Sequence, residues 1–186
     1  MPVPRNPAEE LALEWAIIEG YLALPNVRLS SGSGGSAPEA DVVGFRYGGE
    51  TLKIIHVETG NLAENQDSNY KIITDKFSRK RTSDIEVIAK DHLEITKENV
   101  PTECRKIYIT TYVAKKQLPE LREQLAGKEI EFYEITEFVL SVVRKSLDSW
   151  KKMRKKLGLA KDDKVSIPEE YWLLKFIDWM KDCFRE

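Results

Sequence analysis

The sequence predicts an α/β domain in which a mixed β-sheet is flanked by helices and followed by a C-terminal helical extension. Three observations lead to it: a glycine-linked pair of β-rich segments, an alternation of strand and helix patterns after that pair, and a closing segment more apolar than a surface helix needs to be. A length of 186 residues suits one such domain. We assign the domain to residues 1–160 and the extension to residues 161–186.

The composition limits the classes of protein to which the chain can belong. Hydrophobic residues make up 41% and charged residues 32%, which argues against both a disordered and a membrane-spanning chain. The start, MPVPRNPAEE, has no apolar signal segment, and Cys104 and Cys183 are too few for a disulfide framework. We therefore expect a cytoplasmic protein. The net charge of −2 gives no overall sign of nucleic-acid binding, so such a role must depend on local clusters.

An opening helix is predicted over residues 7–24, with apolar side chains at helical spacing. Pro7 suits its first turn, and Pro25 ends it. A short extended segment over residues 27–30 follows. The stretch after it, SSGSGGSAP at 30–38, is flexible by composition.

A β-hairpin is predicted over residues 41–47 and 51–58, because two β-rich segments flank the adjacent glycines at 48–49. Side chains alternate between the two faces of a strand. His56 and Glu58 therefore share one face of the second strand.

The rest of the chain alternates between helix and strand patterns. The expected elements are a helix within 61–80, strands over 106–113 and 128–135, and helices over 118–126, 136–157 and from 167 onward; 85–89 is ambiguous. The last helix is too apolar for one buried stripe. We expect Trp172, Phe176 and Trp179 to be largely buried, either within the chain or in a homodimer formed through the C-terminal helix.

Two carboxylates of the hairpin are candidates for a metal site. Asp41 begins its first strand and Glu58 ends its second, about equally far from the turn, so antiparallel pairing brings them to one sheet edge. Oxygen ligands of this kind suit Mg²⁺, or Mn²⁺ in its place. A backbone carbonyl near Thr59 is a further candidate ligand. In the alternative interpretation, Asp41 is a turn or edge residue and Glu58 faces solvent.

Arg79, Lys80 and Arg81 form a basic cluster that follows the predicted helix within 61–80, and a second cluster at 151–156 ends a longer helix. Such runs either bind phosphate groups or are solvated faces that favour the helix dipole.

Several of these segments resemble the PD-(D/E)xK nuclease superfamily, which has a restriction-endonuclease-like fold. The opening helix, PAEELALEWAIIEGYLAL, resembles the first helix of that family. The first hairpin strand, in EADVVGF, resembles its "D" strand, and the second, which ends in HVETG, resembles its "(D/E)xK" strand. The later passages KIYITTYV and KEIEFYEI fit the rest of its core, so the resemblance covers residues 7–157.

The resemblance implies roles for individual residues. Asp41 and Glu58 take the metal-ligand positions, and Glu14 takes the acidic position of the first helix. Gly60 stands where the family has a lysine that orients the attacking water. The resemblance therefore also implies that a lysine of the following helix replaces it.

Lys71 and Lys76 are the candidates for this replacement, and Lys76 lies nearer the predicted buried stripe of its helix.

The function that follows is an Mg²⁺-dependent nuclease that cleaves phosphodiester bonds in DNA, with Arg79, Lys80 and Arg81 gripping the backbone. A catalytically inactive module of the same fold, used for nucleic-acid binding or protein assembly, is the alternative. A protein-interaction domain with no nucleic-acid role is a third hypothesis.

Overall fold

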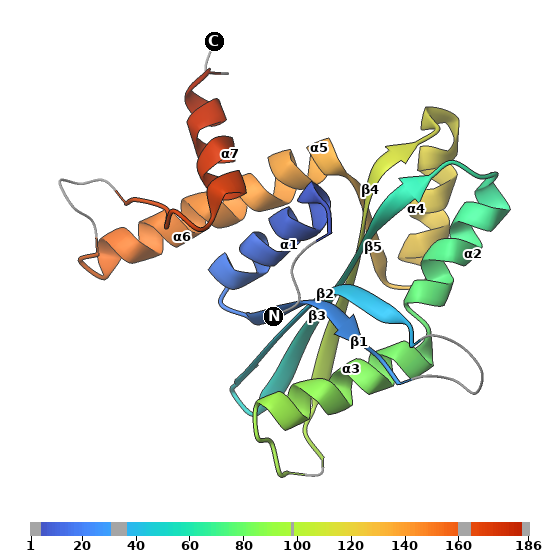
Figure 1. Ribbon diagram of the computed structural model, residues 1–186, viewed down its shortest axis with the longest axis horizontal. Coiled ribbons are helices and arrows are strands. Elements are labelled where there is room, and N and C mark those ends of the chain that lie inside the picture. The colour runs from blue at the N-terminus through green and yellow to red at the C-terminus, as the bar shows by residue number, and fades with distance from the viewer. Residues whose placement is uncertain (1–4, 31–36, 98, 160–164, 184–186) are drawn as a thin grey trace.

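The computed structural model describes residues 5–30, 37–97, 99–159 and 165–183, which fold around one mixed β-sheet (Figure 1). The sheet has five strands in the order β1 (Leu22–Arg28), β2 (Glu39–Gly48), β3 (Thr51–Leu62), β4 (Thr102–Val113) and β5 (Ile130–Glu134). β2 is antiparallel to both of its neighbours, β1 and β3, whereas β4 is parallel to β3 and β5 is parallel to β4. This is the mixed sheet flanked by helices that the sequence predicts.

The helices lie on both faces of the sheet. They are α1 (Pro7–Ile18), α2 (Gln66–Lys76), α3 (Arg79–His92), α4 (Leu118–Ala126), α5 (Ile135–Glu137), α6 (Arg144–Lys156) and α7 (Trp172–Cys183). α5 and α6 are joined by wider π-helical turns and form one continuous rod. The hydrophobic core divides in the same way: α1 and the rod cover one face, with α7 packed on α1 and α6, and α2, α3 and α4 cover the other face.

The opening helix is shorter than the sequence predicts, because it ends at Ile18 rather than near residue 24. Gly20 follows with a φ of 83°, a left-handed conformation that glycine adopts without steric cost and that turns the chain away. The next residues form the edge strand β1, which includes Pro25. Proline is tolerated there because an edge strand has one side without ladder hydrogen bonds.

The hairpin of β2 and β3 has the register on which the candidate site depends. Val42 lies opposite Val57, and Gly48 lies opposite Thr51 at the turn. The two residues between Gly48 and Thr51 both have positive φ, 59° for Gly49 and 64° for Glu50, as a tight type I′ turn requires. The turn is thus centred one residue later than the two glycines suggest.

The single helix predicted within residues 61–80 is two helices. β3 continues to Leu62, α2 begins at Gln66, and α3 begins at Arg79 after the break. The ambiguous residues 85–89 belong to α3, where Ile85 and Ala89 are buried against the sheet. The prediction failed here because α3 has only a narrow apolar stripe, which periodicity detects poorly in a short window.

The C-terminal helix α7 packs on the domain through one side only. Leu174 and Ile177 are buried in the core beside α1, but the exposed fractions of Trp172, Phe176 and Trp179 are 51%, 49% and 64%. The expectation that these three aromatic residues are buried within the chain is therefore wrong. Their burial against a second copy stays a prediction.

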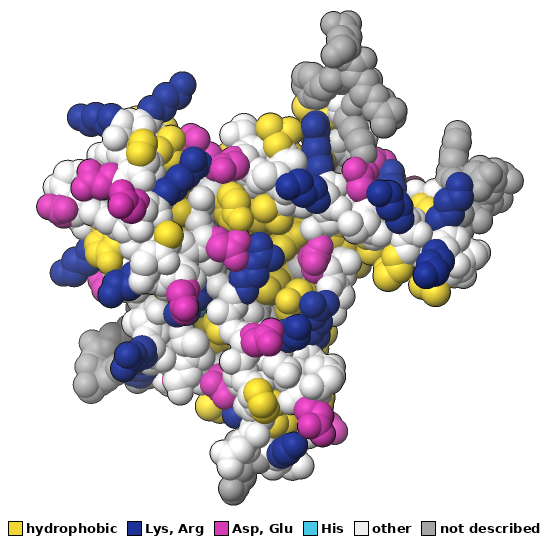
Figure 2. Space-filling model, turned by 180° about the vertical axis from the view of Figure 1, so that it is seen from behind, with side chains coloured by type: hydrophobic (Ala, Val, Ile, Leu, Met, Phe, Trp, Pro, Cys, Tyr) yellow, Lys and Arg dark blue, Asp and Glu magenta, His cyan; other side chains and the backbone are white. Residues whose placement is uncertain are grey.

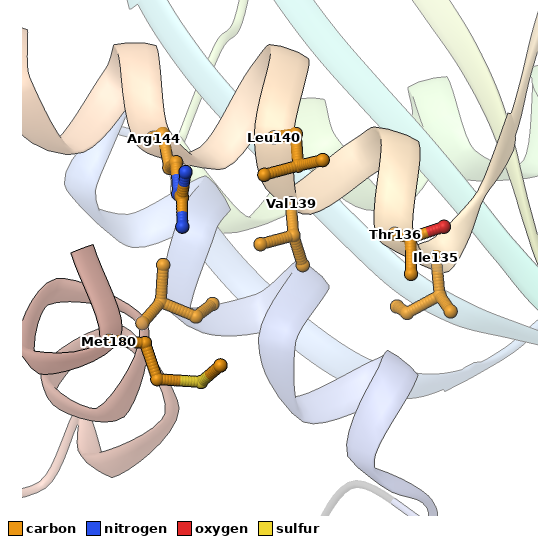
Figure 3. A pocket seen from close by; sticks show the side chains of 7 residues that line it. Ile135, Thr136, Val139, Leu140, Arg144 and Met180 are labelled. Atoms are coloured by element: carbon orange, nitrogen blue, oxygen red, sulfur yellow. The ribbon is translucent and has the colours of Figure 1, made fainter. Parts of the chain in front are cut away.

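A pocket of about 420 Å³ opens between α7 and the rod (Figure 3). Met180 lies on the α7 side of this pocket, and Val139 and Leu140 lie on the rod.

Charged residues of both signs are interspersed over the face shown in Figure 2, with hydrophobic side chains visible between them and Lys and Arg side chains on the arm that α6 forms. In the described ranges, no helix combines the length and the apolar character that crossing a bilayer requires.

Gly44 offers a test of the hairpin packing. A Cβ atom there would lie 2.7 Å from Cγ1 of Ile55 and 3.0 Å from Cβ of Tyr21. We expect Gly44→Ala to lower the free energy of unfolding by about 1–3 kcal/mol, because the core has no room for the added methyl group. Gly48→Ala is the matched control, since nothing lies within 4 Å of a Cβ at that position. Equal midpoints of the two variants in urea denaturation would contradict this packing.

Candidate active site

Asp41 and Glu58 are brought together by the register of the hairpin. Each is one residue beyond the Val42–Val57 pair, so the two stand opposite each other on neighbouring strands. Residues opposite each other in an antiparallel pair point to the same face. That face is the one covered by α2 and α3, and the position lies where β2 begins, before the C-terminal end of β3 at Leu62.

Glu58 is a fully buried carboxylate with positive groups on its two oxygens. Oε1 lies 2.8 Å from Nε2 of His56 and 3.7 Å from Nη1 of Arg81, and Oε2 lies 2.5 Å from Nζ of Lys76. Burial acts to raise the pKa of Glu58, but the hydrogen bond and charge of His56, together with Lys76, outweigh it and hold the pKa below its usual value. Glu58 is therefore an anion at neutral pH.

His56 fixes the orientation of Glu58 and is itself held by packing. Its ring has no exposed surface and makes an edge contact with the ring of Phe77, with centroids 4.7 Å apart. Nδ1 has no hydrogen-bond partner in the described part of the chain, whereas Nε2 faces a carboxylate. Because a carboxylate oxygen only accepts, Nε2 donates the hydrogen bond to Glu58. His56 is thus fully buried.

Asp41 is more accessible than Glu58, with a side chain 18% exposed, and its pKa shifts in the opposite direction. Its Oδ2 accepts hydrogen bonds from the backbone N–H of Thr59 at 2.7 Å and from the Thr59 hydroxyl at 3.1 Å. Burial, followed by the negative charge of Glu58, raises the pKa of Asp41, although Lys76 and the Thr59 hydrogen bonds act in the opposite direction. Thr59 thus contacts Asp41 through its N–H and hydroxyl, and a backbone carbonyl near Thr59 as a metal ligand stays a prediction.

Lys76 links the two carboxylates. It lies in the last turn of α2, where a cation also favours the helix dipole, and its Nζ is 2.5 Å from Glu58 and 3.7 Å from Asp41. Lys71, the other candidate for the missing lysine, is an exposed residue on the same helix. Of the two candidate lysines, Lys76 is the one that contacts the carboxylates of Asp41 and Glu58.

The acidic residue of α1 nearest the site is Glu9, not Glu14. The Glu14 carboxylate accepts hydrogen bonds from the backbone N–H groups of Leu173 and Leu174 at the start of α7, so it lies away from Asp41 and Glu58. Glu9 is 4% exposed and interacts electrostatically with Asp41 and Lys76; burial first, and then the Asp41 charge, raise its pKa against the opposing hydrogen bond from Arg5.

A signal for Glu9 exists in the sequence. The passage Asn-Pro-Ala-Glu at 6–9 has the spacing of a helix cap in which the third helical residue reaches back to the cap. The structure has this arrangement: the Asn6 side chain accepts from the N–H groups of Ala8 and Glu9 and donates to the Glu9 carboxylate at 2.6 Å. The cap orients the Glu9 carboxylate at the helix start; its burial and its nearness to Asp41 depend on how α1 docks.

The basic cluster Arg79, Lys80 and Arg81 begins a helix instead of following one. It occupies the first turn of α3, where the helix dipole already presents positive charge and where no acidic residue is present. The explanation that these residues favour a helix C-terminus therefore does not apply. Arg81 turns toward Glu58, while Arg79 and Lys80 are exposed beside it. This is an arrangement suited to an anion.

The donor set suits a hard cation only in part. Asp41 and Glu58 supply carboxylate oxygens on one face of the sheet, and no residue that the structure describes donates a hydrogen bond to Oδ1 of Asp41. Across the described ranges, no group of three or more His, Cys, Asp or Glu residues is arranged to hold a metal ion. Two carboxylates alone are an incomplete set of ligands; where proteins bind Mg²⁺ through one or two carboxylates, water and substrate phosphates take the remaining positions.

Comparisons with known proteins add no information on function. No protein-family model and no curated protein matches the chain. A solved crystal structure of a protein of unknown function resembles it at 12% sequence identity with a TM-score of 0.41, over 94% of this chain and 97% of the other.

The opposite pKa shifts of Asp41 and Glu58 predict opposite effects on stability. Because the pKa of Asp41 is raised on folding, its ionised form opposes folding once the pH exceeds its unfolded value of about 4. We expect Asp41→Asn to raise the free energy of unfolding at pH 7 by roughly 0.5–2 kcal/mol. The gain should shrink as the pH falls toward 4.

Glu58→Gln is the matched comparison for this experiment. The contribution of ionised Glu58 to the free energy of unfolding is present above the pKa of the unfolded chain and is lost as the pH falls through the lower pKa of the folded protein. Glu58→Gln should therefore be less stable than the unmodified protein at pH 7. Urea denaturation across the pH range measures both variants. A loss of stability in Asp41→Asn at pH 7 would show that the Asp41 charge is not strained in the folded protein.

Proposed function

We propose that the site formed by Asp41, Glu58 and Lys76 hydrolyses phosphodiester bonds of DNA with Mg²⁺ as cofactor. One observation supports this most strongly: the Lys76 ammonium contacts both carboxylates, 2.5 Å from Glu58 and 3.7 Å from Asp41. A cation in this position compensates for Gly60, which stands where the resembling nucleases carry a lysine. We expect Mn²⁺ to support the reaction in place of Mg²⁺.

Asp41 and Glu58 would hold the metal, with Glu9 as the next nearest acidic group. When bound, the ion would lower the pKa of the attacking water and neutralise negative charge on the phosphate. A cation held by Asp41 would offset the burial and the Glu58 charge that raise the pKa of this carboxyl group.

Lys76 and the start of α3 supply the remaining positive charge. In hydrolysis, a water oxygen forms a bond to phosphorus, the ester P–O bond breaks, and the leaving oxygen takes up a proton. Lys76 orients the water and stabilises negative charge on the phosphate, since its ammonium sits against the carboxylates at which the reaction occurs. The exposed Arg79 and Lys80 contact the flanking backbone phosphates.

A catalytically inactive module is the second candidate function. The observation that favours it is that both oxygens of Glu58 are already engaged, Oε1 by His56 and Oε2 by Lys76. In this case Lys76 neutralises the site permanently, no metal enters, and the basic start of α3 binds nucleic acid without cleaving it.

The catalytic role of Lys76 is tested by removing its ammonium. We expect the purified protein to nick plasmid DNA in the presence of Mg²⁺, and Lys76→Ala to slow nicking by about 10²–10³-fold, because one group that stabilises transition-state charge is removed. Lys71→Ala is the matched control, an exposed lysine of the same helix. Its rate should equal that of the unmodified protein.

Glu58→Gln should slow nicking at least as much as Lys76→Ala, since it removes a proposed metal ligand. If the unmodified protein cleaves neither DNA nor RNA, single- or double-stranded, with Mg²⁺ or Mn²⁺, the nuclease proposal is wrong and the inactive module becomes the better account.

Nucleic-acid binding is tested separately through its salt dependence. Binding of a fluorescent DNA duplex should weaken steeply as salt rises, because phosphate contacts release counterions. The double substitution Arg79→Ala and Lys80→Ala should reduce the slope of log affinity against log salt by about 1 for each phosphate that the protein no longer neutralises. Lys53→Ala is the control, because Lys53 lies at the other end of β3 beside Glu103. Binding without salt dependence would favour the protein-interaction hypothesis.

A further inference from the structure

Gly60 and Tyr108 form a close contact at the candidate site. A Cβ atom on Gly60 would lie 2.7 Å from the hydroxyl oxygen of Tyr108 and 3.7 Å from Cζ. A carbon atom cannot come within 2.7 Å of the hydroxyl oxygen unless one of the two atoms moves. A side chain at position 60 and the Tyr108 hydroxyl therefore exclude each other, and the hydroxyl occupies the space that a motif lysine would need.

The Tyr108 ring is held in place by its surroundings. Tyr108 is 1% exposed, its ring is stacked on that of Phe132 with centroids 6.1 Å apart, and its Cα pairs with that of Glu58 across β3 and β4. The ring therefore has little freedom to withdraw its hydroxyl from the site.

The hydroxyl is a proton donor at neutral pH. Burial, followed by the negative charges of Glu58 and Asp41, raises the pKa of Tyr108 far above its usual value. Those two charges also place the phenol within the electrostatic field of the candidate metal ligands. A protonated hydroxyl can donate a charge-assisted hydrogen bond to an anionic oxygen that enters the site.

We propose that the Tyr108 hydroxyl donates a hydrogen bond to a non-bridging oxygen of the phosphate that is cleaved, from the space that Gly60 leaves open. This assignment rests on the proposed nuclease function and adds a residue to it. Lys76 then supplies the charge of the missing lysine, while Tyr108 supplies a donor from the position that the lysine side chain would occupy. The combination explains why position 60 is glycine: any side chain would displace the hydroxyl.

The test compares two substitutions that each remove one tyrosine hydroxyl. Tyr108→Phe keeps the ring and its stacking on Phe132, and should lower kcat for DNA cleavage by about 10²-fold with little change in KM, because the hydrogen bond strengthens in the transition state. Tyr133→Phe is the control. It removes a hydroxyl that donates to Glu131 at 2.8 Å on the next strand, and it should leave kcat unchanged.

A second pair of variants tests whether Gly60 acts through the hydroxyl. Gly60→Ala should lower kcat in the unmodified protein, because its methyl group displaces the Tyr108 hydroxyl, but should cause little further loss in Tyr108→Phe, where the hydroxyl is absent. Circular dichroism and urea midpoints identify any variant whose loss comes from unfolding. Additive losses of activity from Gly60→Ala and Tyr108→Phe would overturn the proposed coupling.

The outcomes separate this inference from the function beneath it. If the unmodified protein cleaves DNA and Tyr108→Phe cleaves as fast as Tyr133→Phe, the role of Tyr108 is wrong and the nuclease proposal stands. If the unmodified protein cleaves no nucleic acid with either metal ion, both are overturned.

Discussion

The burial of the Glu58 charge is the constraint to which the neighbouring residues are fitted. A carboxylate without solvent exposure is costly unless it is paired and hydrogen-bonded. Here His56 from the same strand, Lys76 from the end of α2 and Arg81 from the start of α3 surround it. The break between α2 and α3 brings two cations from adjacent helices to one anion. Loss of Glu58 would leave these positive groups without their common partner.

The arrangement around Asp41 differs, and the difference has chemical value. Asp41 keeps some exposure, and its charge is opposed by that of Glu58. One carboxylate of the pair is thus stabilised as an anion, while the other is held in a less favourable state that an additional cation would improve.

The sequence allows the hairpin and its carboxylates to be predicted, because alternation, the glycines and the equal distances from the turn are all local signals. Other features depend on contacts between distant segments. Which acid of α1 reaches the sheet edge, Glu9 or Glu14, is decided by how that helix docks. The relation of Gly60 to Tyr108 depends on the register of β3 with β4, which no local pattern reveals. The exposed side of α7 likewise depends on how that helix docks against α1 and α6.

The topology of the sheet also bears on the order in which the molecule folds. Antiparallel pairing of β2 and β3 closes only a tight turn, whereas parallel pairing of β3 and β4 must first close a long crossover that contains α2 and α3. Local pairing is therefore expected to precede the crossover. In such an early species Asp41 and Glu58 already stand side by side, but Lys76, Arg81 and Tyr108 have not yet arrived, and water screens the two negative charges until the crossover closes over them.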